Sequence, residues 1–258
     1  MKTVEMTIGS ESRADFTNNA AFCVGTGRMG LALQEEYQKQ LQMAQELAHF
    51  QHIRGHGLFC DDMAIYQPWT DADGAEHEGY CFTYLDRVVD SYLRLNIKPF
   101  LELGFMPQKM AGGTQTIFYW KGNVTPPADF DKWAAMVKAT LTHLAQRYGS
   151  EEVSSWPCEV WNEPNLVNFW ENADKQKYLQ LYAVTAKAVK EVLPQMRVGG
   201  PAILRRQRFA GMGEGFSRLL PGRTAPAGFC HPSCVHGSDA PAQGKIHVPR
   251  NVRGVRHL

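Results

Sequence analysis

Apolar and polar positions along the first 203 residues predict strands and helices in alternation. Short apolar runs predict strands, and apolar residues spaced three or four apart predict helices. Strands are expected at 22–25, 50–54 and 98–104, just before Asn162, and at 197–202, and helices at 31–47, 84–95, 129–148 and 175–192. Four strand–helix units followed by one more strand indicate an α/β fold with a parallel sheet.

Residues 204–258 have a different character from the residues before them. They hold 9 Lys and Arg against 2 Asp and Glu, whereas residues 1–203 hold 18 against 24, so a net charge of −6 gives way to +7. The segment is rich in Arg, Gly and Pro, and it shows no sustained apolar period. We therefore expect one domain at 1–203 and a disordered tail at 204–258. So abrupt a change is typical of a frameshifted or truncated reading frame, which is the origin we expect for this tail.

The overall composition is that of a soluble globular protein, with 44% hydrophobic residues, 21% charged residues and a net charge of +1. No apolar run approaches the length of a membrane span, and the N-terminus lacks the apolar core of a secretory signal. A cytoplasmic protein with six free cysteines is therefore expected. The spacing of Cys230, His231, Cys234 and His236 matches no common zinc site, so neither a metal nor a cofactor is expected.

The most informative segment is 156–165, with the sequence Trp-Pro-Cys-Glu-Val-Trp-Asn-Glu-Pro-Asn. Its Asn-Glu-Pro follows a predicted strand, which puts Glu163 at the strand end where α/β barrels hold their catalytic groups. A carboxylic acid there can protonate a glycosidic oxygen while the Asn162 amide holds a sugar hydroxyl. The indole rings of Trp156 and Trp161 can line an apolar pocket that raises the pKa of the acid. The structural alternative is a Glu that caps the next helix.

Residues 25–30, Gly-Thr-Gly-Arg-Met-Gly, match the dinucleotide fingerprint G-x-G-x-x-G between a strand and a helix. That fingerprint also expects an acidic residue near the end of the second strand. This chain has Arg54 there, which would instead meet a 2′-phosphate. Because a lone fingerprint is weak evidence, we favour the alternative that the glycines serve a tight turn.

Other candidate site residues follow the second and third predicted strands. His56 lies between two glycines at a strand end, where it is expected either to contact a sugar hydroxyl at the same edge as Glu163 or to be structural. Phe118 opens an aromatic run in the loop after the third strand and is expected to form a wall of a substrate pocket. Glu102 and Glu159 are expected to be interior polar groups and not reacting carboxylates.

Taken together, these segments resemble the N-terminal half of a β-xylosidase of glycoside hydrolase family 39. The resemblance covers residues 22–203 and is carried by residues 23–28, 53–58, 99–107, 115–127 and 156–165. It implies part of a (β/α)₈ barrel, with about four βα units and a fifth strand, and a retaining mechanism. It also implies that Glu163 is the general acid/base, that Asn162 holds the 2-hydroxyl and that His56 contacts the terminal xylose. Cys158 stands where the family usually has Phe.

The family's nucleophilic Glu lies after the seventh strand in an Ile-Thr-Glu-Tyr-Asn-like run, and this sequence contains no such run. We therefore expect the chain to descend from an exo-acting β-xylosidase that hydrolyses xylo-oligosaccharides or other β-xylosides. We expect this chain itself to be inactive. The alternatives are a sugar-binding remnant without catalysis and an α-L-iduronidase-like activity. The Arg-rich tail would give at most non-specific nucleic-acid binding. No membrane partner is expected, and full-length relatives are expected to form homo-oligomers.

Overall fold

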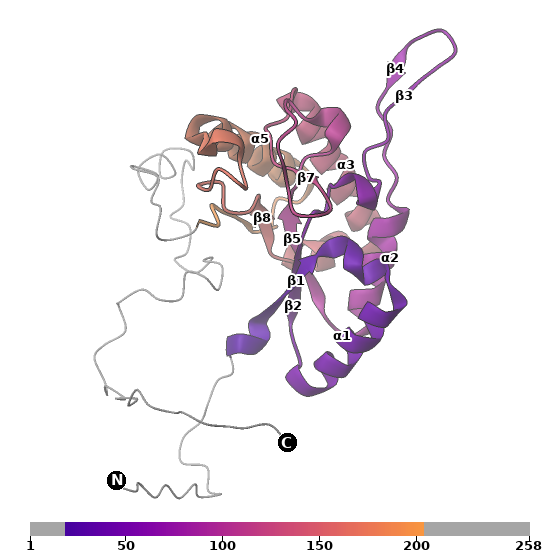
Figure 1. The fold of residues 1–258 in the computed structure, drawn as a ribbon. Helices are drawn as coiled ribbons and strands as arrows, with labels where there is room; N and C mark the ends of the chain where they lie inside the picture. The colour runs from indigo at the N-terminus through magenta and orange to yellow at the C-terminus, as the bar shows by residue number, and fades with distance from the viewer. Residues whose placement is uncertain (1–18, 204–258) are drawn as a thin grey trace, which may run out of the picture.

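The computed structural model describes residues 19–203, and Figure 1 shows their arrangement. The main sheet has five strands in the order β1-β2-β5-β8-β9, and all neighbouring pairs are parallel. The strands are β1 (Cys23–Arg28), β2 (His52–His56), β5 (Lys98–Leu103), β8 (Cys158–Val160) and β9 (Val198–Gly199). The predicted parallel α/β sheet is confirmed. Each of its strands lies beside the next one along the chain, as in a barrel wall.

The helices connect these strands and lie on one side of the sheet (Figure 1). The α-helices are α1 (Glu35–Ala48), α2 (Thr83–Arg94), α3 (Phe130–Tyr148), α4 (Ser150–Ser155) and α5 (Lys175–Val192). The 3₁₀ turns are η1 (Asn19–Phe22), η2 (Met29–Leu33), η3 (Asp61–Met63), η4 (Gln108–Met110) and η5 (Glu171–Ala173). Two hairpins extend from the loops, β3 (Trp69–Thr70) with β4 (Glu76–His77), and β6 (Thr116–Ile117) with β7 (Gly122–Asn123).

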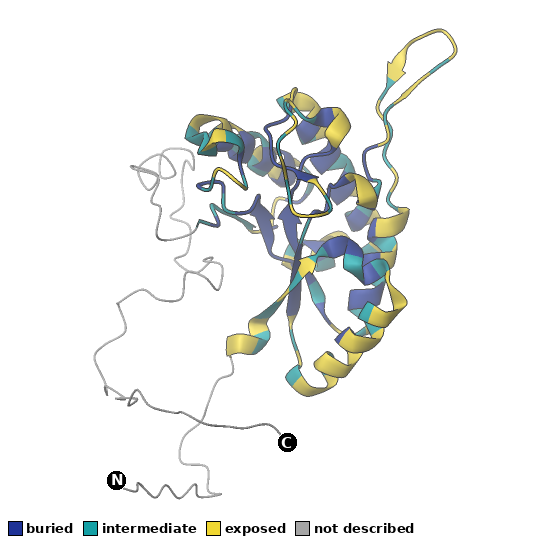
Figure 2. Cartoon of the chain, in the orientation of Figure 1, coloured by how far each residue is buried: buried dark blue, intermediate teal, exposed yellow. Residues whose placement is uncertain are grey.

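The period of two along the central strands separates the apolar core from a polar interior. On β5, Leu101 and Leu103 belong to the apolar core, which Figure 2 shows as dark blue between strands and helices. Glu102 between them is also buried but points to the opposite side of the sheet, because successive strand residues alternate. On β2, Ile53 and Arg54 divide in the same way. The strands therefore deliver charged side chains to the sheet face that the helices leave open.

Two helix predictions match the structure closely because side-chain caps fix where each helix begins. The Asp129 carboxylate accepts hydrogen bonds from the backbone N–H groups of the second and third residues of α3, and the Asp174 carboxylate does the same for α5. Such caps satisfy N–H groups that have no partner inside the helix. At the other end of α3, Gly149 has φ +92° and ends the helix.

The predicted helix at 31–47 is confirmed from Glu35 onward, but its predicted start is four residues too early. Gln34 is extended, with φ −89° and ψ 130°, so the chain forms the separate elements η2 and α1. Leu47, near the C-terminal end of α1, is 87% exposed although it is apolar. Helix α4 was not predicted, because its six residues are too few to show a period.

The dinucleotide interpretation of residues 25–30 is also wrong. Gly25 and Gly27 lie inside β1, where the register with β2 shifts between them, and Gly27 has φ +73°. The short 3₁₀ turn η2 follows the glycines, and the next α-helix begins only at Glu35, so no α-helix N-terminus lies directly after the glycines to hold a phosphate. The favoured alternative, glycine for conformational freedom, is confirmed at Gly27.

The described residues end at Ile203, so the domain boundary expected there stays a prediction. The expected disorder of 204–258 and the Cys–His segment at 230–236 lie outside them. None of the helices within 19–203 combines the length and apolar character needed to cross a bilayer. The same residues contain no group of three or more His, Cys, Asp or Glu placed to hold a metal ion.

Candidate active site

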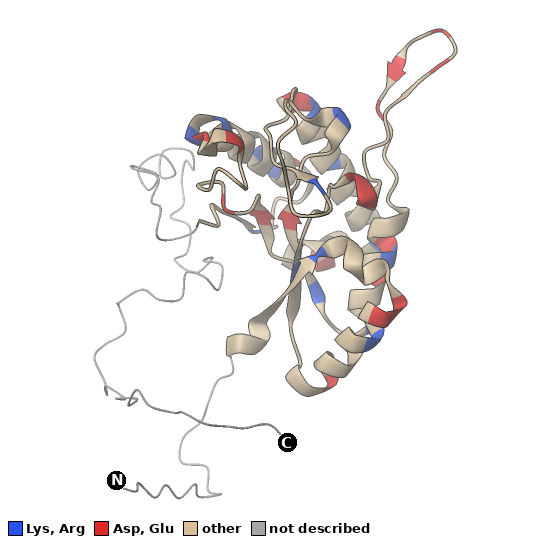
Figure 3. Ribbon diagram, viewed as in Figure 1, with Lys and Arg blue, Asp and Glu red and all other residues tan. Residues whose placement is uncertain are grey.

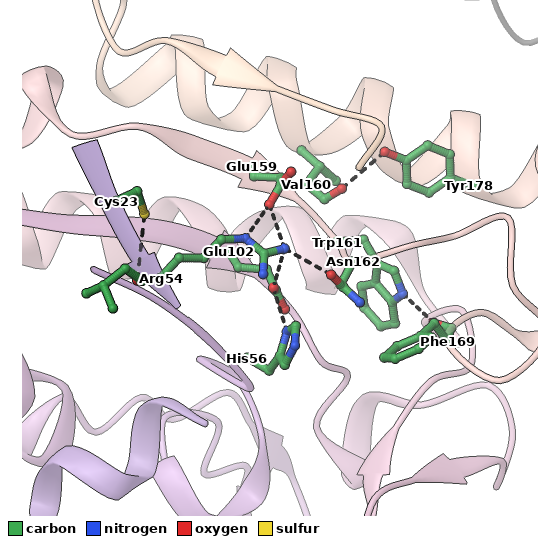
Figure 4. A network of polar contacts seen from close by, with 11 residues as sticks. Cys23, Arg54, His56, Glu102, Glu159, Val160, Trp161, Asn162, Phe169 and Tyr178 are labelled. Atoms are coloured by element: carbon green, nitrogen blue, oxygen red, sulfur yellow. Dashed lines mark hydrogen bonds and ion pairs between the residues drawn. The ribbon is translucent and has the colours of Figure 1, made fainter. Parts of the chain in front are cut away.

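The candidate site lies where the main strands end. His56 is the last residue of β2, and Glu163 comes three residues after the end of β8. Because the strands are parallel, these two ends share one edge of the sheet, as predicted. The two groups are close enough that a charge on His56 would lower the pKa of Glu163. Figure 4 shows the polar network behind this edge.

Arg54 is the centre of that network, and sequence reasoning missed its role. Its Nε donates to Glu159 Oε2 at 2.8 Å, and its Nη2 lies 2.7 Å from Glu102 Oε2. The same Nη2 donates to Asn162 Oδ1 at 3.0 Å. Figure 3 shows the acidic ends of β5 and β8 side by side in red, and Figure 4 shows the guanidinium between them. Arg54 therefore links β2, β5 and β8. Because its guanidinium is occupied by these buried partners, the interpretation of Arg54 as a 2′-phosphate ligand is wrong.

The signal that could have found Arg54 is its position two residues before His56. Residues i and i+2 on a strand face the same side of a sheet, so a predicted site residue at His56 implies that Arg54 points the same way. Two of its partners, Glu159 and Asn162, lie 105 and 108 residues further along the chain. No local pattern identifies them before the strand order is known.

Glu102 and Glu159 are interior groups, as predicted. Arg54 and both carboxylates are almost completely buried, with side-chain exposures of 7%, 0% and 6%. Burial raises the pKa of Glu159 even though Arg54 acts in the opposite direction. Both carboxylates contact the guanidinium, which makes them supports for the edge of the site and poor candidates for an attacking nucleophile.

His56 is held by one of these carboxylates. Its Nδ1 lies 2.7 Å from Glu102 Oε2. Because an ionised carboxylate can only accept, Nδ1 carries the proton and donates it, which leaves Nε2 to act toward a ligand. The imidazole stacks on the rings of Phe105 and Phe118, with centroid separations of 5.8 and 6.0 Å. His56 is therefore both packed and orientated.

The chain between Trp161 and Glu163 turns sharply. Trp161 has φ +67° and Glu163 has φ +43°, values that non-glycine residues rarely adopt and that cost about 1–3 kcal/mol each. Trp161 is completely buried, and its Nε1 donates to the Phe169 carbonyl at 2.6 Å. The ring packs edge-on against Trp170, 5.0 Å between centroids. This anchor holds the turn that presents Asn162 and Glu163 at the strand end.

Glu163 itself is half-buried. Partial burial raises the pKa of its carboxyl, while the positive charges of His56 and Arg54 lower it and the Glu102 carboxylate raises it again. The helix-cap alternative is wrong, because the next α-helix, α5, is capped by Asp174. A raised pKa suits a carboxyl group that must keep a proton to give away.

Trp156 does not belong to this site, contrary to the sequence interpretation. It precedes β8, while Glu163 follows it, so the two lie at opposite ends of the strand. Its Nε1 donates to Glu152 Oε1 at 2.8 Å, and its ring lies against Tyr148. Only the second indole of the motif, that of Trp161, lies at the edge that carries Glu163.

Phe118 forms part of an aromatic wall beside His56. Its ring stacks on Trp120 at 4.3 Å and meets Phe169 edge-on at 5.6 Å. It is 41% exposed, so one part of the ring faces solvent. Phe169 was not predicted as part of this wall, because it lies in the loop after β8 with no pattern of its own.

Comparison with known proteins identifies the family. Residues 4–211 match the sequence profile of glycosyl hydrolases family 39. The chain belongs to this family. A β-xylosidase of Geobacillus stearothermophilus is 57% identical to this family 39 chain over 203 residues, 79% of this chain and 40% of that protein. A β-xylosidase of Caldicellulosiruptor saccharolyticus is 39% identical over 202 residues, 78% of this chain and 41% of that protein.

A solved structure of a family 39 β-xylosidase from Caulobacter crescentus superimposes with a TM-score of 0.70 at 40% identity. The match covers 77% of this chain and 43% of that one. The partial barrel expected from the sequence is thus confirmed as the fold of this family 39 chain. The chain spans about two fifths of the length of the curated relatives it matches.

The raised pKa of Glu163 can be measured by a carboxyl ¹³C titration, with the resonance assigned by its absence in Glu163→Gln. The midpoint is expected above the ordinary value of about 4.3, because burial disfavours the charged form. Replacing His56 by Ala should raise the midpoint further, since its charge lowers the pKa of Glu163. A midpoint at or below the ordinary value would contradict this account of the site.

Proposed function

We propose that this chain carries the acid/base half of a retaining β-xylosidase site, with Glu163 as the general acid/base. The observation that carries the proposal is the half-buried Glu163 beside an Asn162 amide fixed by Arg54, at the strand edge of a family 39 chain. The names of its relatives in Geobacillus and Caldicellulosiruptor, both β-xylosidases, support the choice of a β-xyloside as substrate.

Each residue has a definite part in the proposed reaction. Protonated Glu163 gives its proton to the glycosidic oxygen as the bond to the sugar carbon breaks, and later takes a proton from the attacking water. Asn162 already accepts from Arg54 through Oδ1, so its Nδ2 is the atom that donates to the 2-hydroxyl. His56 Nε2 bonds another hydroxyl, and Phe118 covers the apolar side of the sugar.

The reaction also needs a carboxylate that attacks the sugar carbon and forms the glycosyl–enzyme bond. Glu102 and Glu159 are committed to Arg54, and the sequence holds no segment like the family's nucleophile run. We therefore propose that the 258-residue chain binds a xyloside without turning it over. Sugar binding without hydrolysis is therefore the second candidate function. It is favoured for the 258-residue chain because both buried carboxylates already contact Arg54.

The experiment that tests the proposal is a graft. The 203 residues of this chain that align with the Geobacillus β-xylosidase at 57% identity replace their counterparts in that protein. The graft is expected to hydrolyse xylo-oligosaccharides, because the rest of that protein would supply the nucleophile. A folded graft without activity on any β-xyloside would contradict the proposal.

A further inference from the structure

The β3–β4 hairpin carries an exposed tryptophan away from the candidate active site. The hairpin projects from the body of the molecule after β2, and it is coloured mainly as exposed in Figure 2. Trp69 is 55% exposed and stands directly opposite His77 in the hairpin register. Its exposed ring gives the hairpin a flat apolar surface on which another ring or a sugar face can stack.

The ring of Trp69 is held in one orientation by its neighbours. The His77 imidazole stacks on it at 4.3 Å with 18° between the planes. His77 Nε2 lies 2.7 Å from Asp71 Oδ2, and the other oxygen of Asp71 accepts from the backbone N–H groups of Asp73 and Ala75. The turn therefore fixes His77, and His77 covers one face of the indole. The exposed part of Trp69 is a flat, pre-organised surface.

A cavity of about 310 Å³ lies beside this surface. Polar side chains from the hairpin, from the loop after β5 and from the start of α3 line it. Its lining includes Trp69, Glu76, Glu78, Lys109 and Lys132. Lys132 Nζ pairs with Glu78 Oε1 at 2.8 Å, so this side of the cavity is ordered.

The charges around the cavity select the kind of ligand. Two carboxylates and two ammonium groups line it. Because the two signs of charge are mixed, the cavity favours neither an anionic nor a cationic ligand. A neutral ligand rich in hydroxyl groups fits better, because each hydroxyl both donates and accepts. The Trp69 ring adds a surface for an apolar face of the same ligand. We propose that this cavity binds a pyranose unit of a neutral β-linked oligosaccharide, as a site separate from Glu163.

The position of the cavity agrees with binding of a longer chain. The hairpin follows β2 and Lys109 follows β5, so both belong to loops at the same strand edge as His56 and Glu163. The lining includes no residue of the candidate active site. A second copy of the chain fits less well, because Trp69 is the one large exposed apolar side chain among the described lining residues. A stable protein interface needs about 1,000 Å² or more with an apolar centre.

The test is calorimetric titration of the 258-residue protein with xylohexaose, a choice of sugar that rests on the proposed function. Trp69→Ala is expected to weaken binding at least about tenfold, whereas Trp69→Phe keeps most of the affinity. Tyr84→Ala is the matched control, an exposed aromatic on α2 away from the cavity, and should bind like wild type. Because Trp69 lies on an exposed hairpin, the variants should keep the fold.

His56→Ala separates the two sites. If it leaves xylohexaose binding that a further Trp69→Ala removes, the cavity binds sugar whether or not the proposed active site is right. Equal affinity of wild type and Trp69→Ala would overturn the inference. So would concentration-dependent dimers in sedimentation velocity that Trp69→Ala dissolves, since the hairpin would then be a protein interface.

Discussion

Replacing Glu163 by Ala in the graft is expected to lower kcat/KM by about 10²–10⁴ for xylosides with poor leaving groups, the usual contribution of general acid catalysis. Alkyl xylosides and xylobiose need a proton on the departing oxygen, and Glu163 is the half-buried carboxyl at the strand edge that would supply it. Nitrophenyl xyloside needs far less help, because its leaving group is stable as an anion. The loss of kcat/KM on alkyl xylosides divided by the loss on nitrophenyl xyloside therefore measures how much Glu163 contributes as a general acid.

Two controls make this result specific to proton donation. Glu163→Gln keeps the shape of the side chain but has no acidic proton, so it should lose as much as the Ala variant on poor leaving groups. Glu46→Ala removes an exposed carboxylate on α1 and should change nothing. Equal losses on alkyl and nitrophenyl xylosides would contradict an acid/base role and favour a role in substrate binding.

Replacing Arg54 by Met is expected to lower the free energy of unfolding of the chain by about 3–5 kcal/mol, the usual cost of removing one partner from a buried ion pair. The variant leaves Glu102 and Glu159 almost wholly buried without the guanidinium that bridges them. It also releases Asn162 from the Arg54 hydrogen bond. Urea unfolding followed by tryptophan fluorescence measures the loss.

The pH dependence of this loss has a definite sign. Without Arg54 the buried carboxylates should titrate above their unfolded value of about 4.3, so the folded state would bind protons more tightly than the unfolded state. The penalty should therefore be largest at neutral pH and shrink as the pH falls through the raised pKa. Arg87→Met, on the exposed side of α2, is the control and should cost little. A change under about 1 kcal/mol for Arg54→Met at neutral pH would show that the network does not support the sheet.

Many helices and strands of this fold can be predicted from the sequence, because residues within or next to each element indicate where it begins and what it is. Asp129 and Asp174 mark helix starts, and a buried apolar run marks β5. His56 and Glu163 were placed at one edge by strand direction alone, since parallel strands end together. Where a residue's role follows from its own strand position, the sequence was sufficient.

The failures are roles that depend on distance along a strand or on partners far away in the chain. Trp156 and Trp161 are close in sequence, but an extended strand rises about 3.3 Å per residue and carries them to opposite ends of β8. Arg54 meets Glu159 only through the sheet order. Gln34 leaves the helical region although the apolar spacing continues through it.

The most direct test of the central claim is hydrolysis of nitrophenyl β-xyloside by the purified 258-residue chain, beside its Glu163→Ala form. We propose that the chain supplies an acid/base and no nucleophile. Both proteins should therefore release nitrophenol no faster than buffer, although the wild-type chain binds the sugar. A wild-type rate above buffer that the Glu163→Ala form loses would contradict the account, because a nucleophile would then have to lie within these 258 residues.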